Sequence, residues 1–530
     1  MSQPSTAKPK SIKNNYIYNL IYQILLVVAP LVVTPYISRV LQPAGVGLQS
    51  YSASIVSYFA LVAALGTTTF GPKAIGTLQG DAEGRSRKFW EIFFVRLMMT
   101  LISFAAYLVY VFFMESDGQF VALIFGLQLL GTIFDVSWFF QGMEEFGKIS
   151  LSSILFRVAN IVCIFLFVKT ESDLALYVFF AVIFPAAASA SLWIYMPKYL
   201  VKVRGIRPFS DIKVILQLFV PSVAIQVYTI LDKSMIGWFV EGTEQNGYYE
   251  QAEKVVKMSI AVVSSLGTVM LPRIAQKFKA GDQQGLEFYL YKLYRCVMLA
   301  GVPMMFGLIV ISDVFVPVFF GEGYEECIVL LCVFSLLSLF IGLNSVTNAQ
   351  YLVPTDRQNV FTVIVVIGAV VNCCLNLILI PHYQALGACI ASVVGEFVVL
   401  AAGFIYVAKK KLFRILPIFT SSFRYWIGGA VMFVVLFFLK GVLEVSTLWL
   451  IALVVIGVVV YALCLAILRD PLFFELCGKV FGKIFRRRHA ESAESASAAE
   501  TSAQVGTKAQ KTLPAEDEKA QEQGADDGKK

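Results

Sequence analysis

Apolar runs of about 20 residues recur from residue 16 to residue 468, with only short polar segments between them. A helix of that length crosses the hydrocarbon core of a bilayer, because it rises about 1.5 Å per residue. The chain has 530 residues, of which 58% are hydrophobic and 15% are charged. A soluble fold of this size does not bury so much apolar surface. The expected fold class is therefore an all-α integral membrane protein.

These runs predict fourteen transmembrane helices. The first seven lie near Tyr16–Ile37, Val46–Leu65, Phe89–Met114, Phe120–Phe140, Ile149–Val168, Leu174–Met196 and Val214–Val240. The other seven lie near Val255–Leu271, Tyr289–Ile311, Cys327–Gln350, Val360–Ile380, Leu386–Val407, Tyr425–Leu439 and Leu448–Leu468. The acidic segment 241–254 is expected to be a loop between the seventh and eighth helices.

Lysine and arginine concentrate in alternate loops, and the loops between them are acidic. The positive-inside rule then predicts that both termini lie in the cytoplasm. The tail is rich in Ala, Ser and Glu and cannot form a core. The expected division is a cytoplasmic N-terminal segment (1–15), a first six-helix bundle (16–196), a cytoplasmic linker (197–213), a second six-helix bundle (214–407), a second linker (408–424), helices thirteen and fourteen (425–468), a basic juxtamembrane segment (469–488) and a disordered cytoplasmic tail (489–530).

A shift of about 200 residues aligns the two halves of the chain as a repeat. Leu65-Gly66-Thr67 matches Leu266-Gly267-Thr268, and Ala159-Asn160 matches Val371-Asn372. Equivalent points lie six predicted helices apart, and an even number preserves orientation. The halves are therefore expected to be parallel repeats about an axis along the membrane normal. Two bundles related by such a pseudo-two-fold axis enclose a central cavity, and rocking them gives alternating access.

Other classes of protein fit this sequence poorly. The chain has two histidines and nine cysteines, and no Cys-x-x-Cys pair occurs, so no metal site is expected. It has no nucleotide-binding motif, and its basic residues follow loop topology, so nucleic-acid binding is not expected. We therefore expect a protein that is not an enzyme. A membrane polysaccharide polymerase, the least favoured alternative, needs a larger outer loop than any in this sequence.

Six short motifs are spread over the predicted membrane part. They are Asn14-Asn15-Tyr16, Thr34-Pro35-Tyr36-Ile37-Ser38-Arg39-Val40-Leu41, Gly45-Val46-Gly47, Asp135-Val136-Ser137-Trp138-Phe139-Phe140-Gln141-Gly142, Leu231-Asp232-Lys233-Ser234-Met235-Ile236-Gly237 and Gly247-Tyr248-Tyr249-Glu250. Together they resemble bacterial polysaccharide (oligosaccharide repeat-unit) flippases of the multidrug/oligosaccharidyl-lipid/polysaccharide exporter superfamily. Multidrug exporters and lipid II flippases of that superfamily are the alternatives. Lipid II flippases carry several arginines in their first two helices, whereas here the first helix ends in Arg39 and the second has none.

The resemblance implies transport of undecaprenyl-diphosphate-linked oligosaccharide repeat units from the inner to the outer leaflet of the bacterial plasma membrane. The product would be a capsular polysaccharide, an exopolysaccharide or a cell-wall polysaccharide. The resemblance also implies secondary transport, with H+ or Na+ coupling and no other cofactor. The expected partners are the lipid-linked oligosaccharide and membrane lipids, together with a polysaccharide polymerase and glycosyltransferases.

Charged side chains inside apolar helices are costly and mark polar pathways. A diphosphate needs cations, which arginine supplies as a bidentate fork and lysine as a point charge. The candidates for substrate binding are Arg39, Arg96, Lys233, Lys254, Lys257 and Arg295. The candidates for a gate or for ion coupling are Asp232, Glu396, Asp135 and Arg157.

Each candidate also has a structural interpretation. Arg39 and Lys233 could snorkel to the membrane interface. Arg96 and Arg295 could form ion pairs, as could Arg157 with Asp135, while Lys254 and Lys257 could end a solvated helix. Glu396 has no partner that the sequence indicates.

Arg39 and Asp232 lie near the outer ends of two helices that are repeat equivalents. They are therefore expected to face each other across the cavity. An ion pair between them would close the outer side of the cavity while cargo enters from the cytoplasm.

Overall fold

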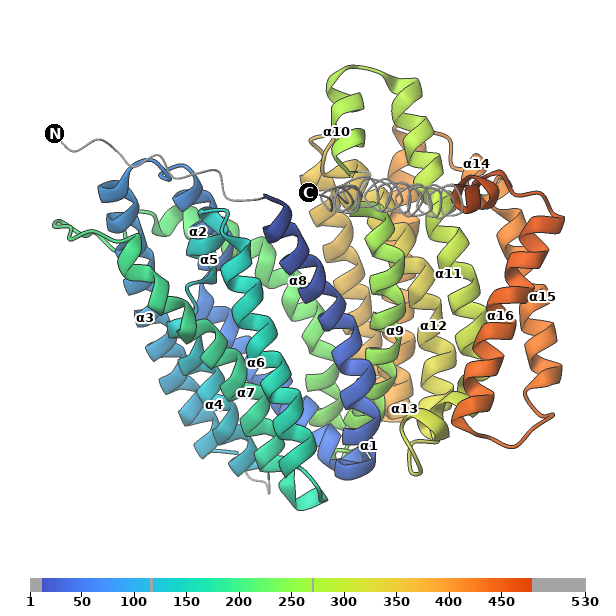
Figure 1. The fold of residues 1–530 in the computed structure, drawn as a ribbon, viewed down its shortest axis with the longest axis horizontal. Coiled ribbons are helices and arrows are strands. Elements are labelled where there is room, and N and C mark those ends of the chain that lie inside the picture. Colours follow the sequence, from blue (N-terminus) through green and yellow to red (C-terminus); the bar gives the residue numbers. More distant parts are fainter. Residues whose placement is uncertain (1–11, 115–117, 269–270, 479–530) are drawn as a thin grey trace, which may run out of the picture. The chain divides into compact units, whose positions relative to one another are not determined.

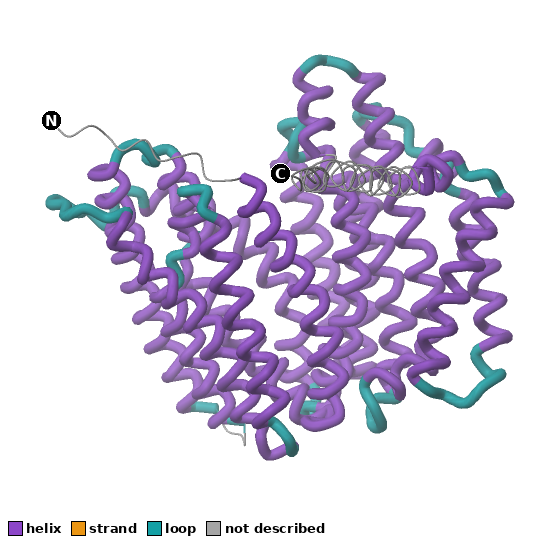
Figure 2. The backbone as a smooth tube through the Cα atoms, in the orientation of Figure 1, coloured by secondary structure: helices purple, strands orange, loops and turns teal. Residues whose placement is uncertain are grey.

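The computed structural model describes residues 12–114, 118–268 and 271–478. All regular structure in this part of the chain is helical, and only short loops join the helices (Figures 1 and 2). The predicted tail, half of the juxtamembrane segment and most of the N-terminal segment lie outside the described residues. The chain divides after Cys464 into two units, Met1–Cys464 and Leu465–Lys530.

The helices follow the predicted apolar runs. The first half contains α1 (Ile12–Ala64), α2 (Thr67–Gly76), α3 (Ala82–Phe112), α4 (Gln119–Phe134), α5 (Ser137–Gly142), α6 (Phe146–Phe167), η1 (Glu171–Asp173), α7 (Leu174–Ser191) and η2 (Leu192–Lys198). The second half contains α8 (Ile212–Phe239), α9 (Glu244–Thr268), α10 (Leu271–Lys279), α11 (Gln283–Phe319), α12 (Glu326–Asn344), the π-helix η3 (Ser345–Leu352), α13 (Gln358–Lys409), α14 (Leu416–Thr420), α15 (Phe423–Leu439) and α16 (Thr447–Ile467).

Two of these helices each contain a sharp turn. Gln42 in α1 (φ 54°, ψ 173°) and Gln384 in α13 (φ 52°, ψ −129°) have non-helical backbone angles. Pro43 follows Gln42, and a residue before proline is disfavoured in the helical region. α1 and α13 therefore each hold two of the predicted spans. Counting each of them once, nine helical stretches among the described residues are long and apolar enough to cross a membrane, and α15 is a shorter apolar helix.

One sequence prediction about local structure was wrong, and one predicted span contains a break that was not predicted. The predicted loop 241–254 is largely helical, because α9 begins at Glu244. Glu244 lies at the helix N-terminus, where a negative charge is favourable, and later acids on α9 precede lysines by four residues. The predicted span 120–140 is broken at Asp135, whose carboxylate accepts a hydrogen bond from the Ser137 N–H at the start of α5 (3.0 Å).

Apolar side chains point outward from the first segment of α13. Val363, Val366, Ile367 and Val370 are 42–58% exposed and recur at the spacing of one helix face. A contiguous apolar face of this kind is unfavourable in water and suits contact with lipid chains. The structure is therefore that of a multi-pass membrane protein.

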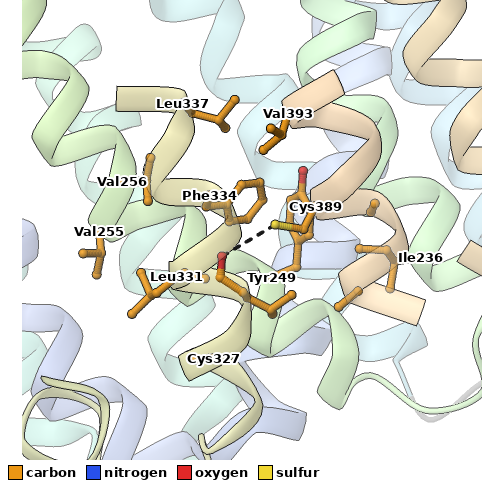
Figure 3. Close-up of a cluster of buried hydrophobic side chains, with 14 of the residues drawn as sticks. Ile236, Tyr249, Val255, Val256, Cys327, Leu331, Phe334, Leu337, Cys389 and Val393 are labelled. Carbon is orange, nitrogen blue, oxygen red and sulfur yellow. Dashed lines mark hydrogen bonds between the residues drawn. The ribbon is translucent and has the colours of Figure 1, made fainter. Parts of the chain in front are cut away.

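A large buried cluster lies where α8, α9, α12 and α13 meet (Figure 3). Its aromatic centre is Tyr249 of α9 against Phe334 of α12, with ring centroids 5.1 Å apart. Cys389 of α13 also lies here, and its thiol donates to the carbonyl oxygen of Leu330 (3.6 Å). This core fixes the positions of the polar groups on α8 and α13 described below.

The turns inside α1 and α13 lie on one side of the molecule, called here the hairpin face. Gln245 at the start of α9 donates to Glu326 Oε2 (2.8 Å) and accepts from the Ala385 N–H (3.2 Å). Thr243 donates to the carbonyl oxygen of Ala44 (2.8 Å). The hairpin face therefore links α1, α9, α12 and α13.

Two glycines bring α1 and α9 into backbone contact at this face. A Cβ atom added to Gly47 would overlap the carbonyl oxygen of Thr243 and lie 2.9 Å from the Gly247 nitrogen. One helical turn further on, Ser50 donates to Glu250 Oε2 (2.8 Å). Both contacts join residues 200 positions apart in sequence, which equals the shift predicted for the internal repeat.

We predict that Gly47→Ala opens the hairpin face. The added methyl group has no space, and overpacking of this kind costs about 1–3 kcal/mol. In a chain whose native cysteines are replaced, we would introduce Ala44→Cys and Thr243→Cys and measure cross-linking with a short reagent. Gly47→Ala should slow cross-linking about tenfold or more. Gly45→Ala is the matched control, because its Cβ would lie 3.2 Å from Leu41 Cβ and clear of α9. Equal cross-linking in both variants would contradict the prediction.

Candidate functional site

Two adjoining cavities lie among the helices of the first half. One, of about 410 Å³, is lined by α1 and by α4–α7, including Asp135, Arg157 and Asn160. The other, of about 300 Å³, shares Asp135, Pro185 and Ser189 with the first and adds Arg96. Further polar lining of the larger cavity comes from Tyr22, Ser137, Gln141, Ser153 and Ser189. Polar and charged groups therefore converge between otherwise apolar helices.

Arg96 and Asp135 form an ion pair in the shared wall of the cavities. Arg96 on α3 is 3% exposed, and its Nη2 lies 2.9 Å from Asp135 Oδ2. The Nε and Nη1 atoms of Arg96 are buried without a hydrogen-bond partner in the structure. Asp135 is available to Arg96 because α4 ends there in extended backbone (φ −74°, ψ 101°). Arg96 thus keeps donors for a further acceptor.

Arg157 and Asn160 lie three residues apart on α6, so they share a helix face. Asn160 Oδ1 is buried and has no hydrogen-bond partner among the described residues. The sequence suggested that Arg157 pairs with Asp135, and this was wrong: Asp135 pairs with Arg96, and within the described part of the chain Arg157 makes no ion pair. Two arginines and one aspartate leave one positive charge without a carboxylate partner in the cavity walls. Guanidinium groups in such a setting bind phosphate groups well.

The predicted lysine candidates form a second cluster, on α8 and α9. Lys233 Nζ lies 2.5 Å from Glu250 Oε2 and 2.8 Å from Glu253 Oε2. Lys254 pairs with Glu250 (3.1 Å) and Lys257 with Glu253 (2.7 Å). The structure therefore brings the three lysines together, but two glutamates that sequence analysis had not singled out neutralise most of their charge. The spacing of four residues in both α9 pairs was the available signal.

The side chain of Asp232 does not share the partners of its neighbour Lys233; it faces Tyr249 of α9 and the polar residues of α13. It is 6% exposed, and it accepts hydrogen bonds from Tyr249 Oη (2.6 Å), Asn376 Nδ2 (2.6 Å) and Ser392 Oγ. Asn372 also reaches Asp232 Oδ1 (3.2 Å) when its amide is oriented to donate. These partners are all neutral, although a buried carboxylate normally has a cation or loses its charge. Sequence analysis missed them, because they lie 17 to 160 residues away.

Arg39 does not form the predicted ion pair with Asp232. It is exposed, and its Nη2 donates to the carbonyl oxygen of Val318 (2.6 Å) in the last turn of α11. Helix C-termini attract cations, because their carbonyl groups point outward. Arg39 therefore tethers α1 to α11 at the hairpin face, while Asp232 lies buried against α13.

The two remaining candidates also have partners. Arg295 Nε donates to Tyr425 Oη of α15 (3.3 Å). Glu396 Oε2 accepts a hydrogen bond from Asn344 Nδ2 (2.6 Å). The structure therefore places the ten candidates in the first-half cavities, the lysine cluster, the Asp232 site, the hairpin face and the contacts of α11 and α12.

Comparisons with solved structures place the fold. The chain is similar to the lipid II flippase MurJ in its inward closed conformation, with a TM-score of 0.68 and 17% identity over 87% of this chain and 99% of that one. It is also similar to the MATE multidrug transporter DinF-BH, with a TM-score of 0.53 and 17% identity over 77% and 98% of the two chains.

Sequence relatives point the same way. The chain is 22% identical to a putative O-antigen transporter of Escherichia coli over 76% of this chain and 98% of the relative. It is 24% identical to a probable low-salt glycan biosynthesis flippase of Haloferax volcanii, over 33% and 36% of the two chains. Residues 12–278 match a family described as polysaccharide biosynthesis protein. The chain belongs to this family, and it shares the membrane fold of the two solved transporters named above.

Proposed function

We propose that the chain moves undecaprenyl-diphosphate-linked oligosaccharide repeat units from the inner to the outer leaflet of the bacterial plasma membrane. The observation that carries this proposal is the uncompensated positive charge at Arg157 and Arg96 in the first-half cavities. Moving a bare diphosphate through hydrocarbon is prohibitively costly, so the carrier must supply cations along the route. The putative O-antigen transporter among the relatives supports the same class of cargo.

The lining of the larger cavity suits a diphosphate joined to a sugar. Arg157 supplies donors for phosphate oxygens, and Arg96 Nη1 and Nε supply more from the shared wall. Serine hydroxyls and the Gln141 and Asn160 amides offer donors and acceptors to sugar hydroxyls. The volume of about 410 Å³ is within the range of small-molecule sites. A cation exporter would instead favour an acidic lining.

Asp232 is the proposed coupling site for H+ or Na+. It is a buried carboxylate between neutral oxygen- and nitrogen-bearing groups on α9 and α13. Intramembrane carboxylates of this kind mark ion or proton sites. Loading and unloading a cation there would change the charge between α8 and α13, and so the packing of those helices.

The proposed transport cycle is alternating access by two parallel six-helix bundles in a fourteen-span topology. Both termini would be cytoplasmic and the hairpin face external, following the loop charges. In the present structure the hairpin face is held together by Gly47, Gly247 and Arg39. This arrangement fits a state that receives cargo from the inside. Capsular, exopolysaccharide or cell-wall synthesis would then supply the glycan, with glycosyltransferases and a polymerase as partners.

We predict that Arg157→Gln weakens binding of undecaprenyl diphosphate at least about tenfold, because a charge-assisted hydrogen bond contributes about 1.5–3 kcal/mol. Binding would be measured on the full chain in nanodiscs, with undecaprenol as the lipid that lacks phosphate. Arg87→Gln is the matched control, because Arg87 is surface-exposed and pairs with Glu83 (3.0 Å). Unchanged affinity in Arg157→Gln would remove the cavity from the proposal.

We predict that Asp232→Asn abolishes the acceleration of cargo transport by a Na+ or H+ gradient in proteoliposomes, while binding of undecaprenyl diphosphate persists. The asparagine keeps the shape of the side chain and removes the charge that a cation would neutralise. Asp313→Asn is the control, because Asp313 is partly exposed and pairs with Lys440 (2.5 Å). Gradient-driven transport that survives Asp232→Asn would place coupling elsewhere.

The proposed topology predicts where reporter fusions will be active. Fusions after Gly118, Gly242 and His382 should report an external location, and fusions after Gly80 and Gly205 a cytoplasmic one. A single fusion on the wrong side would overturn the arrangement.

A further inference from the structure

The π-helix η3 extends α12 and carries an unusual number of buried polar residues. π-helical segments are rare and occur frequently at functional sites. Asn344 at the junction is 6% exposed, and Asn348 within η3 is 2% exposed. Asn344 Oδ1 and both side-chain polar atoms of Asn348 have no hydrogen-bond partner within the part of the chain that the structure describes. Burying such groups unpaired costs stability, which favours a ligand that pairs with them.

These amides face a strip of α13 that includes a carboxylate. Asn344 Nδ2 donates to both Glu396 Oε2 (2.6 Å) and the Glu396 carbonyl oxygen (3.0 Å), which leaves Asn344 Oδ1 beside the carboxylate. Seven residues further along α13, a Cβ on Gly403 would lie 3.3 Å from Asn348 Oδ1. The small residue at that position lets Asn348 lie against α13 below Glu396.

The strip continues directly to the proposed coupling site. Ser392 precedes Glu396 by four residues and therefore lies on the same face of α13, one turn away. Its hydroxyl donates to Asp232. Oxygen-bearing groups thus run from Asp232 through Ser392 to Glu396, and on to the two asparagines.

We infer that Glu396, Asn344 and Asn348 form a second Na+ site, one turn of α13 from the Asp232 ligand Ser392, through which the coupling ion passes. Carboxylate and amide oxygens are the hard ligands that such cations prefer. An amide oxygen does not take up a proton near neutral pH, so the unpartnered asparagine oxygens favour a metal cation over H+. This inference rests on the proposed coupling at Asp232. It adds the identity of the ion and the path that the ion follows.

The test is Na+-dependent thermal stabilisation of the purified full chain in nanodiscs, at constant ionic strength with choline as the replacement cation. A ligand that binds the folded state raises its stability with concentration. Wild type should respond to Na+, and Asp232→Asn should keep a reduced response. The double variant Asp232→Asn/Glu396→Gln should lose the response. Complete loss in Asp232→Asn alone, or no response in wild type, would overturn the inference.

The variant Asn348→Leu tests whether Asn348 binds Na+ or only supports the fold. Replacing an unpartnered buried amide with an apolar side chain of similar volume is not expected to unfold the chain. If Asn348 binds Na+, the half-saturating concentration in the Asp232→Asn background rises at least tenfold, whereas an unchanged value overturns its role. Glu287→Gln, at a half-buried glutamate of α11 whose carboxylate accepts from Gln283 (3.2 Å), is the control.

Binding of undecaprenyl diphosphate, measured on the same samples, distinguishes the two proposals. Retained lipid-diphosphate binding without any Na+ response would overturn the second cation site alone. A Na+ response without discrimination between undecaprenyl diphosphate and undecaprenol would instead contradict the proposed cargo.

Discussion

A charge inside apolar helices must find a partner, and this constraint organises the interior of the protein. Asp135 pairs with Arg96 from the break in helix between α4 and α5, where its backbone is extended. Lys233 lies between Glu250 and Glu253, which fixes α8 against α9. Where every cation contacts a carboxylate, as in the lysine cluster, the result is mainly structural. Where one does not, as around Arg157, the protein retains binding capacity for an anion.

The second constraint is steric and acts at the hairpin face. Helices that approach through glycine bring their backbones closer than any side chain allows, and Gly47 and Gly247 do so at repeat-equivalent positions. Such a contact between two helices is either made or lost. A small separation of the helices would open a gap between their backbones that no side chain fills. The Arg39 hydrogen bond to the end of α11 adds a polar tether nearby. A close backbone contact with a polar tether can open as a unit. The ion pair predicted between Arg39 and Asp232 would instead join α1 to α8 and would not hold α1 against α9.

Sequence analysis predicted much of this fold and less of its interior chemistry. Apolar runs locate helices well, because membrane length and hydrophobicity are properties of a continuous segment. The break at Asp135 and the early start of α9 depend on side-chain contacts and were missed. Glu250 and Glu253 were accessible from their four-residue spacing to lysines. The partners of Asp232 were not, because Asn376 and Ser392 become its neighbours only when α13 packs against α8. Candidate residues were therefore easier to predict than their pairings.

α8 is the element that can link cargo to coupling ion. Near its start Ile215 packs with Leu65 and Val95 of the first half, and near its end Asp232 bonds to α13. A change in the charge state of Asp232 alters the contacts of one end of α8, and the other end belongs to the packing next to the first-half helices. If ion binding favours one placement of α8 and diphosphate binding another, each ligand changes the affinity for the other by the same factor. Such reciprocity requires only that the two sites share one helix with two arrangements, so the cavity and the Asp232 site need not touch.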